Sequence, residues 1–156
     1  MEKKRVIRKA RIRDVKPIQS LINYYAQKGE LLARSLNEIY EDLRDFSVYD
    51  LEEEVVGVCA LHINWEDLAE IRALAVKEEC NGQGYGTQLV KKCLEEAQQL
   101  GINRVYTLTY RPGFFERLGF QRIDKIQLPQ KVWGDCIRCF KFPECDEIAL
   151  ISQLTT

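Results

Sequence analysis

The chain has 156 residues, 46% of them hydrophobic and 30% charged, with a formal net charge of −1 at pH 7. These are the values of a globular domain large enough to bury a core, and the nearly neutral balance argues against a nucleic-acid partner held by a basic surface. No run reaches the roughly 18 apolar residues that a membrane span needs. Because the charged N-terminus also lacks an apolar signal core, we expect one cytoplasmic domain over residues 1–156.

The N-terminal region predicts a strand followed by an amphipathic helix. The strand is expected over residues 5–10, and Asp14 is a candidate N-cap for a helix that Gly29 can end. One face of this helix carries the apolar residues Val15, Ile18, Leu21, Ile22 and Tyr25. Basic residues crowd the N-terminus, where we expect a solvated strand edge rather than a site for a polyanion: Lys3, Lys4, Arg5, Arg8, Lys9, Arg11 and Arg13.

The region up to residue 76 predicts a second helix and three strands. Ser35 is followed three residues later by Glu38, which is the spacing of a capping box and favours a short helix through about Leu43. Strands are expected over residues 46–50, 54–63 and 68–76. The acidic stretch 51–53 supplies the turn between the first two of them.

The C-terminal half predicts two more helices and two more strands. A helix follows a glycine-rich run at residues 81–86 and ends at Gly101. Residues 104–110 are rich in β-forming residues, Pro112 can open a short helix over 113–118, and 120–126 form a further strand. The order β-α-α-β-β-β-α-β-α-β predicts an α/β fold with a mixed central sheet and helices on both faces.

The glycine-rich run Asn81-Gly82-Gln83-Gly84-Tyr85-Gly86 is the strongest candidate for a binding site. Alternate glycines let the backbone turn tightly and approach a ligand without a Cβ atom in the way. The helix that follows offers backbone N–H groups and the positive end of its dipole, which suit a phosphate group. The run lacks the lysine of a P-loop, and its spacing and mid-chain position differ from those of the dinucleotide fingerprint.

Three blocks of the chain resemble the GCN5-related N-acetyltransferase (GNAT) superfamily, in the family's order and spacing. Residues 81–86 match the motif Arg/Gln-x-x-Gly-x-Gly/Ala, with Asn81 where arginine or glutamine is usual. Residues 71–77 are similar to the family's fourth strand, and Phe-Phe-Glu-Arg-Leu-Gly-Phe at 114–120 is similar to its C-terminal signature. The resemblance covers almost the whole chain and implies a GNAT domain.

This resemblance implies that acetyl-CoA is the co-substrate. Backbone N–H groups near the glycines would hold the pyrophosphate, and the strand edge at Leu74 and Val76 would pair with the pantetheine arm. The residues that the resemblance assigns to acetyl-CoA are Leu74, Ala75, Val76, Asn81, Gly82, Gln83, Gly84, Tyr85, Gly86 and Thr87.

A narrower resemblance concerns the acceptor. Segments at 31–35, 57–62, 69–76, 128–136 and 141–147 are similar to N-acetylglutamate synthases, the tail segments to the short stand-alone bacterial form. The resemblance implies acetyl transfer to the α-amine of L-glutamate, which is the first step of arginine synthesis. The amino-acid-kinase domain of the long form is not in this sequence, so feedback by arginine does not follow from the resemblance.

A dicarboxylate acceptor requires cations in its site, and arginine suits a carboxylate because its fork donates two parallel hydrogen bonds. The resemblance assigns this role to Arg34, and His62 stands where the family often has lysine. A histidine can bind a carboxylate when protonated, or by donating its single N–H when neutral. Further candidates, for which a plain surface cation is the simpler interpretation, are Arg72, Lys131 and Arg138.

The acceptor amine has to lose a proton before it attacks the thioester. Glu70 in the predicted fourth strand is placed to accept that proton through a water molecule, the alternative being a solvent-facing strand residue. A strand amide near Leu74 can bind the oxyanion. Phe115 occupies the position where many GNAT enzymes have a tyrosine as general acid, so the group that protonates the CoA thiolate stays open.

The six cysteines are expected to be reduced thiols in a cytoplasmic protein. Cys59 and Cys93 lie on apolar faces and are predicted to be core residues. Three more thiols lie close together in the tail, at Cys136, Cys139 and Cys145. Zinc sites usually have four ligands, and no sequence neighbour completes this set, so we expect no bound metal.

Two other functions stay open at this point. A GNAT enzyme with the same donor can acetylate glutamine, another amino acid or a protein N-terminus, and a domain that binds acetyl-CoA without turning it over would be a sensor. GNAT domains often pair, so a homodimer is the default expectation for the quaternary structure.

Overall fold

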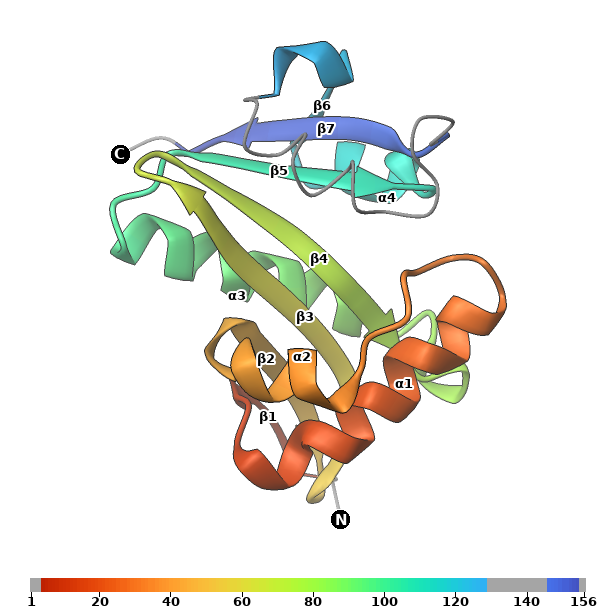
Figure 1. Cartoon of the computed structure of the whole chain (residues 1–156). Coiled ribbons are helices and arrows are strands. Elements are labelled where there is room, and N and C mark those ends of the chain that lie inside the picture. Colours follow the sequence, from red (N-terminus) through yellow and green to blue (C-terminus); the bar gives the residue numbers. More distant parts are fainter. Residues whose placement is uncertain (1–3, 129–145, 155–156) are drawn as a thin grey trace. The chain divides into compact units, whose positions relative to one another are not determined.

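The computed structural model describes residues 4–128 and 146–154. Its strands and helices, in chain order, are β1 Arg5–Lys9, α1 Val15–Gln27, α2 Leu36–Glu41, β2 Phe46–Leu51, β3 Glu54–Trp65, β4 Leu68–Val76, α3 Tyr85–Gln99, β5 Arg104–Thr109, α4 Pro112–Glu116, β6 Gln121–Ile123 and β7 Ile148–Gln153 (Figure 1). Short 3-10 turns lie at η1 Ile12–Asp14, η2 Leu43–Asp45, η3 Glu78–Cys80 and η4 Lys125–Gln127. In this part of the chain, no helix is long and apolar enough to cross a bilayer.

The strands have the order β1-β2-β3-β4-β5-β7-β6, which is a mixed sheet of seven strands. β1 pairs with β2 and β2 with β3 in antiparallel fashion, whereas β4 and β5 are parallel. The chain divides into two compact units. The first unit comprises the residues up to His62 together with Ile71–Glu96, and the second comprises Ile63–Glu70 and the chain from Ala97 onward.

In the first unit, α1 and α2 cover one face of the strands. Because the apolar residues of α1 recur at helical spacing, its inner face is buried from Val15 to Tyr25. That face packs with Ile39 of α2 and with strand residues that share one side of the sheet: Phe46, Val48, Val55, Val58, Ala60, Ala73 and Ala75. Ser35 and Glu38 form the predicted capping box, in which the Glu38 amide donates to Ser35 Oγ at 3.1 Å.

The opposite face of the same strands is covered by α3 (Figure 1). Gly57 of β3 allows this helix to come close, since a Cβ atom there would lie 3.0 Å from Leu89 Cδ1 and 3.5 Å from Val76 Cγ2. Cys59 and Cys93, on β3 and α3, are both fully buried, which confirms that they are core residues. The hydrogen bond with Cys93, and then burial, raise the pKa of the Cys59 thiol well above its usual value. The first unit therefore has helices on both faces, as the sequence predicts.

Arg8 departs from the predicted solvated edge. Its guanidinium lies 2.7 Å from Asp14 Oδ2 and 3.1 Å from Asp50 Oδ2, and its side chain is only 14% exposed. Asp14 occupies the N-cap position of α1, but its carboxylate makes no capping bond and instead accepts from Arg8 and from the Arg11 amide. Burial raises the pKa of Asp14, but these hydrogen bonds lower it by more, so that the carboxyl pKa is below its ordinary value. The predicted N-cap residue is therefore confirmed in its position, but its side chain does not make the capping hydrogen bond.

The second unit is a small sheet with its own apolar cluster. β5 pairs with β7 along its whole length, from Arg104 opposite Gln153 to Thr109 opposite Ile148, and β6 pairs with β7. Leu68, Tyr106, Leu128 and Ala149 form the buried cluster. Phe115 of α4 is buried in edge contacts with the rings of Phe114 and Phe120, at 5.0 and 5.3 Å between centroids.

The structure differs from the sequence prediction mainly near the C-terminus. β7 was not expected, the strand expected over 120–126 is limited to Gln121–Ile123, and the helix expected over 113–118 spans Pro112–Glu116. The second helix ends at Glu41 rather than near Leu43, because the chain there continues into the 3-10 turn η2. The extent of a single domain over residues 1–156 stays a prediction.

Candidate functional site

The glycine turn, residues 81–86, opens α3 in the way that an anion site requires. Gly82 and Gly84 have φ angles of +81° and +82°, which L side chains rarely adopt, and residues 81–84 are exposed. The Gln88 amide donates to the Gly84 carbonyl at 3.1 Å and closes the first turn of the helix. The amides that precede Gln88 therefore lie at the open, positive end of a 15-residue helix.

Aromatic packing fixes the start of α3 beneath this turn. Tyr85 is 2% exposed and stacks on Tyr49 of β2, with 4.0 Å between ring centroids and 16° between ring planes. The Tyr49 hydroxyl donates to Gln88 Oε1 at 3.2 Å. Tyr85 thus serves as an anchor, and a ligand at the turn would meet backbone rather than this ring. A Cβ atom at Gly82 would have no protein atom within 4 Å and one at Gly84 would lie 3.9 Å from Gln88 Nε2, so both glycines leave open space beside the turn.

Ala73 of β4 has a φ of +57° although it is not a glycine. At this residue, the side chains of β4 change the face of the sheet on which they lie. Arg72 pairs with Asp42 at the end of α2, and the neighbouring Ala73 packs into the core beneath α1 and α2. Two consecutive residues therefore point to the same side, whereas Val76 lies on the side of α3. This is the effect of an extra residue in a strand, and a left-handed non-glycine residue costs about 1–3 kcal/mol.

The strand residues predicted to contact acetyl-CoA have different environments. Ala75 is 3% exposed and belongs to the core, so only its backbone is available to a ligand, whereas Leu74 and Val76 are half-buried. The carbonyl of Val76 accepts a hydrogen bond from the Tyr25 hydroxyl of α1. A ligand that pairs with the strand edge at Val76 would use its N–H group or the remaining lone pair of its carbonyl.

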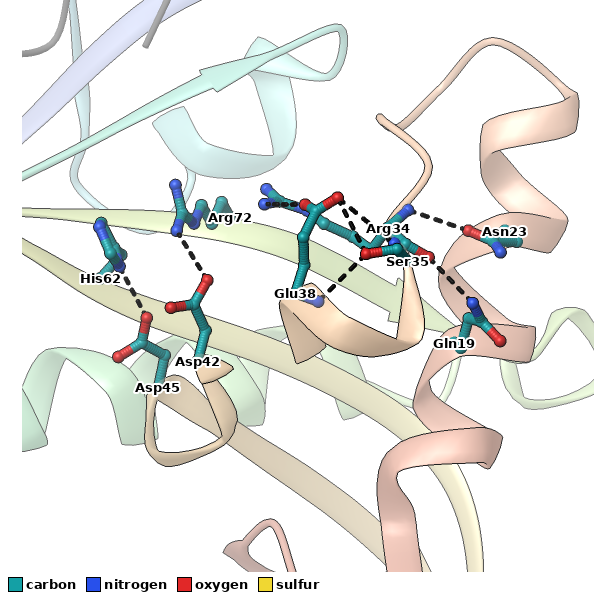
Figure 2. A network of polar contacts seen from close by, with 9 residues as sticks. All are labelled: Gln19, Asn23, Arg34, Ser35, Glu38, Asp42, Asp45, His62 and Arg72. Carbon is teal, nitrogen blue, oxygen red and sulfur yellow. Dashed lines mark hydrogen bonds and ion pairs between the residues drawn. The ribbon is translucent and has the colours of Figure 1, made fainter. Parts of the chain in front are cut away.

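Arg34 lies in the loop before α2 and is held there by α1. The Gln19 amide donates to the Arg34 carbonyl at 3.1 Å, and the Arg34 N–H donates to Asn23 Oδ1 at 3.1 Å (Figure 2). Gln19 and Asn23 are four residues apart and so share one face of the helix. The Arg34 guanidinium lies 3.7 Å from a carboxylate oxygen of Glu38, and its side chain is 17% exposed. The loop backbone is thus fixed, and the guanidinium extends from it toward Arg72 in Figure 2.

Arg72 and His62 each face an aspartate from the segment between α2 and β2. Arg72 Nη2 lies 3.8 Å from Asp42 Oδ2, and His62 Nδ1 lies 2.7 Å from Asp45 Oδ2 (Figure 2). Together with the pair of Arg34 and Glu38, these contacts form what we call the ion-pair cluster: Arg34, Glu38, Asp42, Asp45, His62 and Arg72. All six residues belong to the first unit.

The carboxylates of this cluster are the residues that sequence reasoning missed. A sequence signal existed, since Asp42 and Asp45 are three residues apart where a helix ends and a strand begins. Oxygens of both aspartates and a ring nitrogen of His62 lie within 4.8 Å of one another, which is a spacing that also suits a metal ion. Arg72 faces Asp42 and the ring of His62 faces Asp45, so we interpret the group as an ion pair beside a hydrogen-bonded histidine and aspartate.

The remaining predicted residues lie elsewhere. Glu70 is half-buried in the part of β4 that belongs to the second unit. Phe115 is packed among phenylalanines, as already described. Lys131, Arg138, Cys136, Cys139 and Cys145 lie outside the described residues, and their roles stay predictions.

A cavity of about 710 Å³ in the first unit is formed by α1, the turn between β2 and β3, and η3. Its lining includes Glu53, Glu54, Glu78 and Glu79, with Arg13 and Lys77 as the basic residues. This excess of acidic side chains disfavours an anionic ligand, so the cavity is a poor candidate for a nucleotide phosphate.

Comparison with known proteins gives consistent matches. A family described as Acetyltransferase (GNAT) family matches residues 14–120. A protein of Chlorobaculum tepidum named as an uncharacterized N-acetyltransferase is 43% identical over 148 residues, which are 95% of this chain and 96% of that protein. An amino-acid acetyltransferase of Mycobacterium tuberculosis is 38% identical over 138 residues, 86% of this chain and 79% of that protein. The structure of N-acetylglutamate synthase from Neisseria gonorrhoeae, complexed with coenzyme A and N-acetyl-glutamate, has a TM-score of 0.90 at 27% identity and covers 100% of this chain and 36% of its own.

Proposed function

Because the chain belongs to the GNAT family and is an acetyl-CoA N-acetyltransferase of that type, we propose that its acceptor is the α-amine of an amino acid, with L-glutamate favoured. The observation that carries the proposal is that one unit contains both the glycine turn and the cationic side chains of the ion-pair cluster. The first suits the donor's pyrophosphate, and the second suits the carboxylates of an amino acid. The product would be the N-acetyl amino acid, with CoA released.

On the donor side, we assign the pyrophosphate to the amides of the glycine turn. Gly82 and Gly84 adopt the backbone conformation that turns successive N–H groups outward, and α3 adds its dipole. The strand edge at Leu74 and Val76 would hold the pantetheine arm. An amide near Leu74 would then face the oxyanion that forms when the amine attacks the thioester.

On the acceptor side, we assign the α-carboxylate to Arg34. Its backbone is fixed by two side chains of α1, and its partly exposed guanidinium lies 3.7 Å from a carboxylate oxygen of Glu38. A substrate carboxylate can improve on that distance by accepting two parallel hydrogen bonds. Arg72 is our candidate for a second carboxylate, with Lys131 and Arg138 as further candidates. Glu70 remains the sequence-based candidate for a base that works through water.

The charge of the ion-pair cluster favours glutamine as a second candidate acceptor. Two arginines bring a charge of +2 and three carboxylates bring −3, so the formal charge of the cluster is −1 with His62 neutral and 0 with His62 protonated. An acceptor with one carboxylate meets less repulsion there than one with two. The side-chain amide of glutamine can also exchange hydrogen bonds with Asp42 or Asp45.

Turnover of acetyl-CoA with each of the twenty amino acids tests the proposal. Release of the CoA thiol would be followed in solution, and the acetylated product would be identified by its mass. We expect the largest kcat/KM for glutamate or glutamine. If no amino acid gives an acetylated product while a peptide amine does, the proposed acceptor is wrong.

A further inference from the structure

We infer that His62, held by Asp45, accepts the proton that the acceptor ammonium loses before it attacks the thioester. This assignment rests on the proposed function only in taking the acceptor to be an amine bound at the ion-pair cluster. It differs from the sequence prediction, in which His62 binds a carboxylate and Glu70 removes the proton.

The contact between His62 and Asp45 decides which ring nitrogen is available. His62 Nδ1 lies 2.7 Å from Asp45 Oδ2, and an ionised carboxylate can only accept a hydrogen bond. Nδ1 must therefore carry the proton in the neutral ring, which leaves the lone pair on Nε2. A neutral His62 cannot donate to a substrate carboxylate, because its one N–H group already donates to Asp45. It can accept from an ammonium group.

The charged groups around His62 favour the imidazolium ring that forms when Nε2 takes the proton. Besides Asp45, the charged groups that face it are Asp42, with a carboxylate oxygen within 4.8 Å, and Arg72, which pairs with Asp42. The His62 and Asp45 side chains are 30% and 24% exposed, so the pair is partly shielded from solvent yet accessible to a ligand. A carboxylate that holds the distal nitrogen stabilises the imidazolium, which is the usual arrangement for histidine as a general base.

The proton balance of the reaction is then complete. The acceptor R–NH₃⁺ gives one proton to Nε2 of His62 and becomes R–NH₂, whose lone pair forms a C–N bond with the thioester carbonyl carbon. The tetrahedral intermediate collapses with cleavage of the C–S bond. The second proton of the nitrogen passes to the CoA thiolate, directly or through solvent, and the proton on His62 is released to solvent. Asp45 does not touch the substrate and is a positioning residue.

Kinetics of the full-length chain with His62→Gln test this inference. The amide of glutamine can still donate to Asp45 but cannot take a proton. We expect kcat/KM for the acceptor to fall by about 10²–10⁴-fold at pH 7, with the KM for acetyl-CoA unchanged. The defect should shrink at alkaline pH, where more of the acceptor is already free amine, and far-ultraviolet circular dichroism should match that of the wild type.

Asp45→Asn and Glu70→Gln complete the design. In the wild type, kcat/KM should show an acidic limb, because protonation of the base removes the lone pair that takes the proton. We expect Asp45→Asn to move that limb to lower pH, since the charge that stabilises the imidazolium is lost, and Glu70→Gln to leave it in place. The inference is overturned if His62→Gln retains the limb, if Glu70→Gln abolishes it, or if His62→Gln raises only the acceptor KM. Should the wild type use an amine other than an amino acid, the proposed acceptor fails, while the same variants assayed with that amine still decide the role of His62.

Discussion

The glycine turn and the ion-pair cluster lie in the same unit but are built in opposite ways. The turn offers backbone amides, is exposed, and depends on φ angles that glycine adopts without strain. The cluster offers side chains from the loop before α2, from β3 and from β4, and each of these basic side chains already faces a carboxylate. An anion can bind the turn without displacing a protein group. A carboxylate that binds the cluster has to compete with Glu38, Asp42 or Asp45.

This difference has a consequence for binding. Competition at the cluster lowers the affinity for any carboxylate but also penalises ligands whose charge does not match, so it favours selectivity over strength. The turn recognises a group that every acetyl-CoA molecule carries and needs no such selectivity. We therefore expect variants of the two regions to separate cleanly, with donor KM affected by one and acceptor KM by the other.

Replacement of Arg8 should give the largest effect, a loss of folding stability, because Arg8 pairs with two buried carboxylates in the unit that contains both regions. Arg8→Met leaves the carboxylates of Asp14 and Asp50 buried without their cation, which should lower the free energy of unfolding by about 3–5 kcal/mol. Urea unfolding at pH 7 measures this loss. Lys9→Met is the matched control, since Lys9 pairs with Glu96 at the surface and should change stability by no more than about 1 kcal/mol.

The acid stability of the same variant gives an independent check. In the wild type the pKa of Asp14 is lowered, so its stabilising contribution is present above the ordinary carboxyl pKa and is lost as the pH falls through the lower, folded value. Without Arg8, burial would raise the pKa of Asp14, and acid unfolding should begin at a higher pH than in the wild type. An unchanged acid midpoint would mean that the pair with Arg8 does not stabilise the ionised carboxyl group.

Gly84→Val should weaken donor binding by about 10–100-fold. A β-branched residue at a φ of +82° adds strain of about 1–3 kcal/mol and places methyl groups in the open space beside the turn. The KM for acetyl-CoA should rise while the acceptor KM stays the same. Gly101→Val has the same kind of strain, at a φ of +86° and at the other end of α3, and should leave the donor KM unchanged. Equal effects of both variants would contradict a role for the turn in donor binding.

Arg34→Ala should raise the acceptor KM by about 10–50-fold, the range expected for one hydrogen bond between charged groups. The KM for acetyl-CoA should not change. Arg44→Ala is a suitable control, because Arg44 is exposed in η2, close in sequence to the same elements. An acceptor KM that is the same in Arg34→Ala as in the wild type would remove Arg34 from the site.

Asn23→Ala should have the smallest effect, a rise in acceptor KM of about 3–10-fold. It removes one neutral hydrogen bond that holds the loop of Arg34, and such a bond contributes about 0.5–1.5 kcal/mol. In the double variant with Arg34→Ala the two effects should not add, since both act through the same guanidinium. Asn37→Ala, which removes an exposed contact with Glu41, should leave both KM values as in the wild type.

The regular part of the fold was readable from the sequence, because periodic apolar residues, the capping box at Ser35 and the glycines are local signals. β7 was not predicted, since its six residues become a strand only by pairing with β5 and β6, which come far earlier in the chain. Asp42 and Asp45 were missed for a similar reason. Their partners, Arg72 and His62, come from two other strands, and no sequence spacing records that contact. The positive φ of Ala73 had no signal, because no glycine stands there.

The change of face at Ala73 makes the faces of the later β4 side chains depend on the backbone conformation of a single residue. Arg72 points to the ion-pair cluster and Val76 toward α3 only because one residue between them does not follow the alternation of a strand. If Ala73 adopted an ordinary extended conformation, β4 would alternate plainly, and the side chains after Ala73 would exchange the helix layers that they face. The conformation of one residue thus decides which layer each later side chain of the strand meets.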